Sequence, residues 1–78
     1  MKEHTLEECV RHTLERYFRD LDGESPSCIW DMVQTAIERP MLEVVLQRAQ
    51  GNQSRAADML GINRNTLRKK LDHYQIKF

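Results

Sequence analysis

The residues best suited to chemistry in this sequence are Asn63 and Arg64, which stand at the predicted start of a basic helix. An arginine guanidinium can donate two parallel hydrogen bonds to the major-groove edge of guanine, and an asparagine amide can pair with adenine. We therefore predict that Arg64 and Asn63 contact DNA bases. Capping of the helix is the competing role for Asn63, because asparagine is among the preferred capping residues.

Polar and basic side chains near this pair are of the types that hold the phosphates of a nucleic-acid backbone. Asn52 and Ser54 open the preceding predicted helix, whose free amides and positive dipole end attract anions. Each of these side chains is also consistent with a helix cap or a solvated surface, and only their grouping favours a phosphate-binding surface. The predicted phosphate-contacting residues are Asn52, Ser54, Thr66, Arg68 and Lys69.

Two short helices must position these side chains. Asn52 can cap a helix that Gly61 ends, and Asn63 can cap the next helix, over about residues 64–74. Ala57 and Gly61 are small enough to let the two helices cross closely, which is typical of a helix-turn-helix. In such a unit the start of the second helix enters the major groove, where Asn63 would stand.

Two longer helices are expected before this unit. Thr5 followed by Glu8 is typical of a capping box at the start of the first helix, and Gly23 supplies its stop. The second helix is predicted to begin within residues 25–27, where a serine can cap and a proline is tolerated. Core packing, not base stacking, is the expected role of the aromatic side chains Tyr17, Phe18, Trp30 and Tyr74.

The second helix is expected to continue through Pro40 with a kink and to end at Gly51. Apolar residues after Pro40 cover most of the helix circumference, and a helix that is apolar nearly all round must be enclosed on several sides. A chain of 78 residues has little material for that enclosure. We therefore predict a homodimer whose core contains Met41, Leu42, Val45 and Leu46.

The charges of the chain change sign along its length. Residues 1–50 hold ten acidic and six basic residues, whereas residues 51–78 hold six basic and two acidic ones. A basic end is expected of a phosphate-binding surface, and double-stranded DNA is the predicted partner. The two cysteines have no paired spacing, and we see no secretory leader or membrane-length apolar run. A cytoplasmic protein without a membrane partner is expected.

Catalysis finds little support in the sequence. Cys9 and His12 share one predicted helix face, but two ligands do not make a zinc site. Neither a Ser/His/Asp arrangement nor a Gly-rich phosphate loop is recognisable. We predict no enzymatic activity, cofactor, metal or small-molecule substrate.

The segment GNQSRAADMLGINRNTLRKKL, residues 51–71, resembles the C-terminal segment of the Fis family, the factor for inversion stimulation. The likeness extends over about residues 6–76. It implies an all-α single domain of four helices over residues 1–78, with an intertwined homodimer core in residues 1–50 and a helix-turn-helix in residues 51–78. It also implies a nucleoid-associated protein that bends DNA and regulates transcription.

The resemblance implies a binding mode as well. Two recognition helices would enter successive major grooves, with broad sequence preference set by the width of the minor groove. The family's base-contacting Asn and Arg fall on Asn63 and Arg64. Its phosphate-contacting positions fall on Asn52, Ser54, Thr66, Arg68 and Lys69.

This chain departs from better-known family members at several positions. Asp72 and His73 stand where those members carry lysine, so flanking DNA should be held less strongly. Asn65 replaces a frequent glycine, and Ser54 a frequent threonine. Only five residues precede the first predicted helix, so we do not expect the activation of DNA invertases that longer members perform.

Three other readings stay open. The same motif resembles the DNA-binding tail of sigma-54-dependent enhancer-binding activators, although the Met1 start favours a separate protein. A gene regulator with a narrow set of operators is a second possibility. The third is a helical dimer that binds only proteins, in which the basic tail is a solvated surface.

Overall fold

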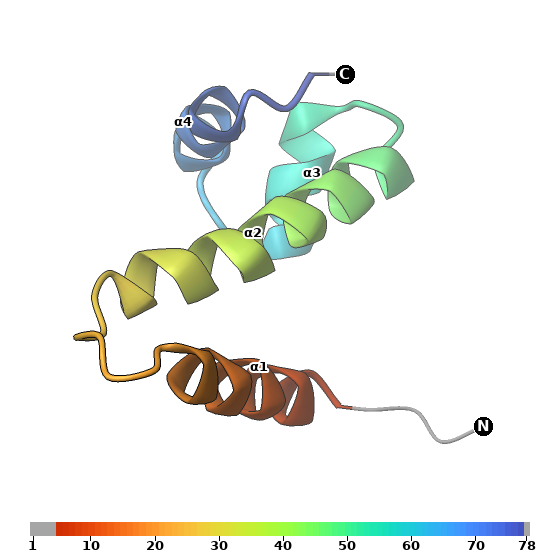
Figure 1. The fold of residues 1–78 in the computed structure, drawn as a ribbon. Helices are drawn as coiled ribbons and strands as arrows, with labels where there is room; N and C mark the ends of the chain where they lie inside the picture. Colours follow the sequence, from red (N-terminus) through yellow and green to blue (C-terminus); the bar gives the residue numbers. More distant parts are fainter. Residues whose placement is uncertain (1–4, 78) are drawn as a thin grey trace. The chain divides into compact units, whose positions relative to one another are not determined.

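The computed structural model describes residues 5–77, which form four α-helices and, within that range, no strand. The helices are α1 (Leu6–Asp20), α2 (Ile29–Arg48), α3 (Gln53–Leu60) and α4 (Arg64–Tyr74), as Figure 1 shows. The predicted all-α class is therefore confirmed. Contacts within the chain separate two compact units, one ending at Val33 and the other beginning at Gln34, so the boundary lies inside α2.

In the first unit, α1 begins where its local capping signal predicts. The Thr5 hydroxyl oxygen accepts a hydrogen bond from the Glu8 backbone N–H at 3.1 Å. Farther along, the Tyr17 hydroxyl both donates to the Ser27 carbonyl, at 3.4 Å, and accepts from the Ser27 N–H, at 3.3 Å. This pair of hydrogen bonds ties the loop after α1 back to the helix.

The predicted start of the second helix is wrong by a few residues. The helix begins at Ile29, not within residues 25–27. Cys28, directly before it, has a φ of 56°, in the left-handed region that a non-glycine residue seldom adopts. Residues 25–27 therefore belong to the loop, and their serines do not cap α2.

Pro40 lies inside α2, which continues to Arg48 as one helix, as predicted. After α2, two successive residues adopt the left-handed backbone conformation: Gln50 has a φ of 56° and Gly51 a φ of 80°. The Gly51 N–H donates to the Leu46 carbonyl at 3.0 Å, which satisfies a carbonyl that the last turn leaves open. Gly51 thus serves as the stop that the sequence predicts.

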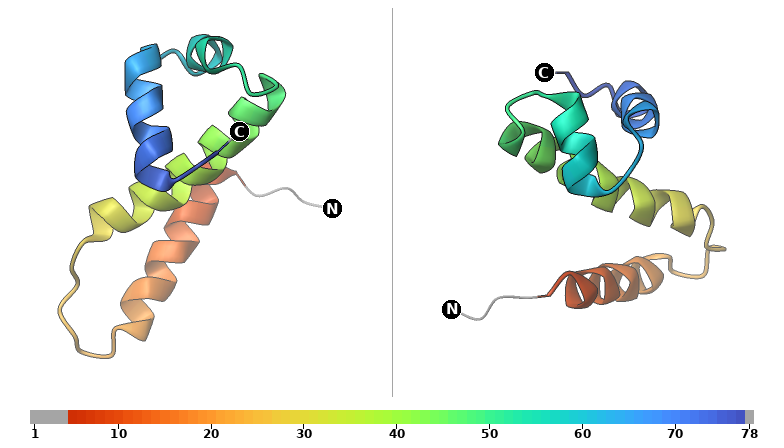
Figure 2. Two further views of the ribbon diagram at one scale, coloured as in Figure 1. Left: turned by 90° about the horizontal axis from the view of Figure 1, so that it is seen from above. Right: turned by 180° about the vertical axis from the view of Figure 1, so that it is seen from behind.

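The core of the second unit is built where α3 and α4 pack against the later part of α2 (Figure 2). Leu42 and Leu46 of α2 and Leu67 of α4 are the largest side chains that are fully buried. Small residues complete the core and let the three helices approach one another. The buried apolar residues are Leu42, Leu46, Ala49, Ala56, Ala57, Leu67, Leu71 and Tyr74.

The sequence predicts that a second subunit encloses the later part of α2. In the structure, α3 and α4 of the same chain bury much of that apolar surface. Leu42 and Leu46 face α3 and α4 of their own chain, and Val45 packs partly against the same core. Met41 is exposed, and so is Val44, at 56% of its surface. The place of these residues in a dimer core stays a prediction.

The four aromatic residues predicted to pack in the core differ in burial, and Tyr17 is half-buried. Tyr74 is buried, as predicted. Trp30 is 79% exposed and Phe18 about half exposed, so the prediction of core packing is wrong for these two side chains within a single chain. Phe18 belongs to α1, which has no buried residue. Trp30 lies in the first turn of α2, whose buried residues, Leu42 and Leu46, come later in the helix.

Candidate nucleic-acid interface

The turn between α3 and α4 is built by residues at its two caps. Asn52 caps α3, with its side-chain oxygen accepting from the Arg55 N–H at 3.1 Å. Gly61 ends α3 with a φ of 76° and donates its N–H to the Ala57 carbonyl at 2.9 Å. Both predicted caps are confirmed, and with them the helix-turn-helix geometry of two short helices joined by a tight turn.

Gly61 has a different role from the one that its size suggests. A Cβ built on Gly61 would meet no atom within 4 Å, so the residue is not needed for a close helix crossing. Its left-handed backbone is the reason for glycine here. Ala57, which is buried, is the small residue at the contact between the helices.

Asn63 caps α4 in the way predicted for its competing role. Its side-chain oxygen accepts from the Asn65 N–H at 2.7 Å. The amide nitrogen of the same side chain is not used by that bond, and the residue is exposed. Capping and a hydrogen bond from the amide nitrogen to a base acceptor are therefore chemically compatible.

Helix α4 has one buried face and one exposed face along its length. Leu67, Leu71 and Tyr74 point into the core, at intervals of four and three residues. The remaining predicted contact residues of this helix, Arg64, Thr66, Arg68 and Lys69, are all exposed. Among residues 5–77, Arg64, Arg68 and Lys69 take part in none of the ion pairs.

The other predicted phosphate contacts lie at the start of α3. Asn52 and Ser54 are both exposed there, in the same compact unit as α4. The positive end of the α3 dipole lies beside these polar side chains. The second unit thus carries all seven residues predicted to contact DNA.

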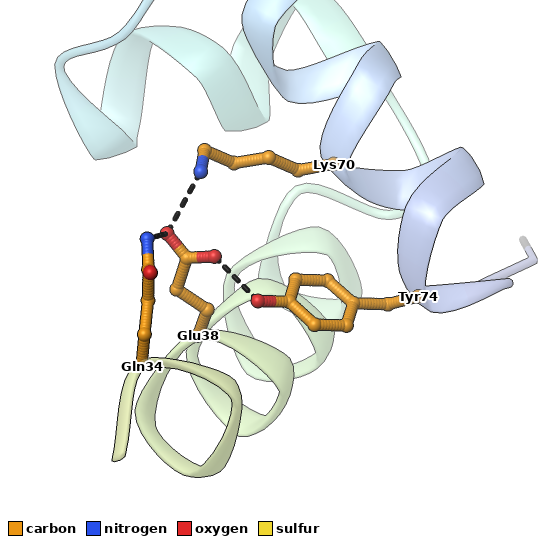
Figure 3. Close-up of polar contacts among 4 residues, drawn as sticks. All are labelled: Gln34, Glu38, Lys70 and Tyr74. Atoms are coloured by element: carbon orange, nitrogen blue, oxygen red, sulfur yellow. Dashed lines mark hydrogen bonds and ion pairs between the residues drawn. The ribbon is translucent and has the colours of Figure 1, made fainter. Parts of the chain in front are cut away.

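A cluster around Glu38 is the feature that sequence reasoning missed. One carboxylate oxygen of Glu38 accepts from the Lys70 ammonium at 2.8 Å, and the other accepts from the Tyr74 hydroxyl at 2.6 Å (Figure 3). Gln34, one turn earlier on α2, donates to the first of these oxygens at 3.5 Å. The Arg39 guanidinium lies 5.4 Å from the centre of the Tyr74 ring, within the range of a cation–π contact.

The cluster shifts the protonation of two of its members. The hydrogen bond from Lys70, with that from Tyr74, lowers the pKa of the Glu38 carboxyl below its ordinary value, although partial burial opposes the shift. The hydrogen bond to Glu38, reinforced by desolvation, raises the pKa of the Tyr74 hydroxyl. Glu38 therefore stays ionised and Tyr74 stays neutral near pH 7.

The described part of the chain was also compared with what metal sites, disulfides and membrane spans require. Among residues 5–77, no three His, Cys, Asp or Glu side chains are placed to share a metal ion. Cys9 and Cys28 are unpaired by any disulfide and exposed. Across the same residues, none of the helices combines the length and apolar character needed to cross a bilayer.

Comparisons with known proteins agree with this geometry. The profile of a family described as "Bacterial regulatory protein, Fis family" matches residues 34–74, which fall within the second unit. A protein of Ralstonia nicotianae, provisionally named a Fis-like DNA-binding protein, is 60% identical over 95% of this chain and 96% of its own length. A Neisseria meningitidis protein with the same provisional name is 52% identical over 87% of this chain and 90% of its own length.

A longer relative extends the comparison. The DNA-binding protein Fis of Glaesserella parasuis is 52% identical over 88% of this chain and 70% of its own length. The family profile covers the helices that hold the candidate site, and the relatives match most of both units. The chain belongs to the Fis family of bacterial regulatory proteins.

Proposed function

We propose that this protein binds double-stranded DNA through α4, with Arg64 and the amide nitrogen of Asn63 contacting base edges in the major groove. The observation that carries the proposal is the division of α4 into a buried apolar face and an exposed face bearing Arg64, Arg68 and Lys69. A guanidinium in the first turn of a recognition helix stands where base edges are read.

Phosphate contacts would hold the helix in place. Thr66, Arg68 and Lys69 lie along α4, and Asn52 and Ser54 lie at the start of α3, so two helices can hold the backbone. The relatives named for DNA binding, at 60% and 52% identity, support the same partner. We assign to the chain a role in binding DNA and no catalytic role.

A homodimer that bends DNA is the assembly we propose. The exposed apolar side chains of α2, including Trp30 and Val44, are candidates for burial between two copies. Two copies would carry two recognition helices into successive major grooves, and bending would let more of each subunit contact the backbone. A nucleoid-associated regulator of transcription with shape-dependent site preference is the resulting function.

Fluorescence anisotropy with short duplexes of several sequences, at two salt concentrations, tests the proposal. We expect binding that weakens with salt, because phosphate contacts release counterions. Arg64→Ala should cost about 1 to 3 kcal/mol at preferred sites and reduce the preference among sequences. Arg64→Lys is the matched control, since it keeps the charge but loses the two parallel donors, and it should retain more affinity than preference.

Three outcomes would contradict this function in whole or in part. If the wild-type protein binds none of the duplexes at low salt, the helical dimer that binds only proteins becomes the better account. If Arg64→Ala binds with unchanged preference, Arg64 does not read bases. A protein that binds one sequence strongly and all others at background level would be a regulator with few operators.

A further inference from the structure

The polar contact between α2 and α4 is made at two adjacent turns of α4. Lys70 and Tyr74 are four residues apart, so their side chains leave the same face of the helix. Both end on the one carboxylate of Glu38, at 2.8 Å and 2.6 Å, each on a different oxygen (Figure 3). Two contacts one turn apart restrict the rotation of α4 about its own axis as well as its distance from α2.

The Glu38 carboxylate is suited to hold α4 because it is largely shielded from water and accepts a further hydrogen bond from α2 itself. The Glu38 side chain is only 16% exposed, and Gln34 donates to it from the preceding turn of α2. Charge-assisted hydrogen bonds of this length are the stronger kind, and shielding from water strengthens them further. The apolar contacts of Leu67 and Leu71 hold α4 in the core, but such contacts carry less directional information.

The same cluster removes one positive charge from the exposed face of α4. Lys69 and Lys70 are neighbours in sequence, yet Lys69 is exposed whereas Lys70 is 31% exposed and paired with Glu38. An ammonium already bonded to a carboxylate has little to gain from a phosphate. The two lysines are therefore not equivalent, although sequence alone gives them the same character.

We propose that Glu38 is a positioning residue for DNA recognition, which orients α4 through Lys70 and Tyr74 and withholds Lys70 from the phosphate backbone. The proposal rests on the proposed function, because it concerns how the DNA-binding helix is aimed. Glu38 itself touches no DNA in this account. It determines which side chains of α4 do so.

The test compares Glu38→Gln with Glu43→Gln by fluorescence anisotropy, using a preferred and a non-preferred duplex at several salt concentrations. Both variants remove one negative charge from α2, and Glu43 is exposed. We expect Glu38→Gln to reduce the ratio of the two dissociation constants by about threefold or more, which is within the coupling found inside one hydrogen-bond network. Glu43→Gln should leave that ratio at the wild-type value.

A second comparison reads the charge of Lys70 directly. Lys69→Met should lower the slope of log affinity against log salt by about one, as the loss of one phosphate contact does. Lys70→Met should leave the slope unchanged. Both variants keep an unbranched side chain, so a difference between them reports the ion pair with Glu38 and not helix propensity.

The outcomes separate this inference from the function on which it rests. Wild-type protein that binds no duplex would overturn both. Wild-type binding with equal site preference in Glu38→Gln and Glu43→Gln, or with equal slope losses in the two lysine variants, would overturn the role of Glu38 alone. If Glu38→Gln does not fold, as judged by circular dichroism, the lysine comparison decides the matter.

Discussion

Asn63 caps α4 with one atom of its side chain and, in the function proposed above, contacts a base with another. Its oxygen is bonded to the Asn65 N–H at 2.7 Å, which satisfies one of the free amides at the start of α4. Its amide nitrogen remains free to donate toward an acceptor on a base edge. The two roles belong to different atoms, so different substitutions can separate them.

Asn63→Ser should keep the cap and lose the base contact, whereas Asn63→Ala should lose both. We expect Asn63→Ala to lower the free energy of unfolding by about 1 kcal/mol, within the range for removed caps, and Asn63→Ser to change it little. Urea unfolding followed by circular dichroism measures this. Both variants should show reduced discrimination among duplexes in anisotropy, since neither carries the amide.

A contrary result would assign Asn63 a single role. If Asn63→Ser discriminates among duplexes as the wild type does, Asn63 serves only as a cap. If Asn63→Ala unfolds at the wild-type urea concentration, the bond to Asn65 contributes nothing measurable to stability.

At the scale of the elements, local signals in the sequence predict most helix ends because caps act within a few residues. Thr5, Asn52, Gly61 and Asn63 each stand at an end that the structure confirms. The start of α2 was mispredicted because it depends on the left-handed backbone of Cys28, a conformation that the residue type does not announce.

The Glu38 cluster could not be predicted for a different reason. It joins residues 32 and 36 positions apart, and no periodicity or cap relates such distant positions. The exposed face of α4 is readable from the spacing of Leu67 and Leu71. Which of its cations is already paired requires the packing of α4 on α2.

The pairing of α2 with α4 should make stability depend on pH. The pKa of Glu38 is lowered by folding, so its contribution is present above the ordinary value of 4.5 and is lost as the pH falls through the lower folded value. The stability advantage of the wild type over Glu38→Gln should therefore be largest near neutral pH and shrink below about pH 4.5. Urea unfolding at a series of pH values measures it.

Glu43→Gln provides the control for this titration, because it removes an exposed carboxylate from the same helix. The difference in stability between this variant and the wild type is the baseline with which the Glu38→Gln result is compared at each pH. A constant difference between wild type and Glu38→Gln from neutral to acid pH would mean that the ionised carboxylate does not stabilise the fold.

At the scale of the whole molecule, the division of the chain inside α2 changes which apolar side chains a second copy would have to cover. The later part of α2 already has its Leu42 and Leu46 covered by α3 and α4, so the second unit contains a core of its own. The apolar surface that remains exposed includes Trp30, Met41 and Val44. A dimer interface would then be built from these exposed side chains, and less from the leucines that the apolar pattern of the sequence suggests.

Val44→Glu tests this division of α2. We expect the wild type to sediment at twice the chain mass at micromolar concentration, and Val44→Glu to shift toward the monomer, because a carboxylate buried in an apolar interface is costly. The variant should still fold, since Val44 is 56% exposed within the chain and the introduced carboxylate would stand four residues before Arg48, a favourable helical pair.

Met59→Glu, at a side chain of α3 that is 52% exposed, is the matched control and should remain dimeric. A wild type that sediments as a monomer would refute the dimer, and a Val44→Glu variant as dimeric as Met59→Glu would place the interface elsewhere on the chain.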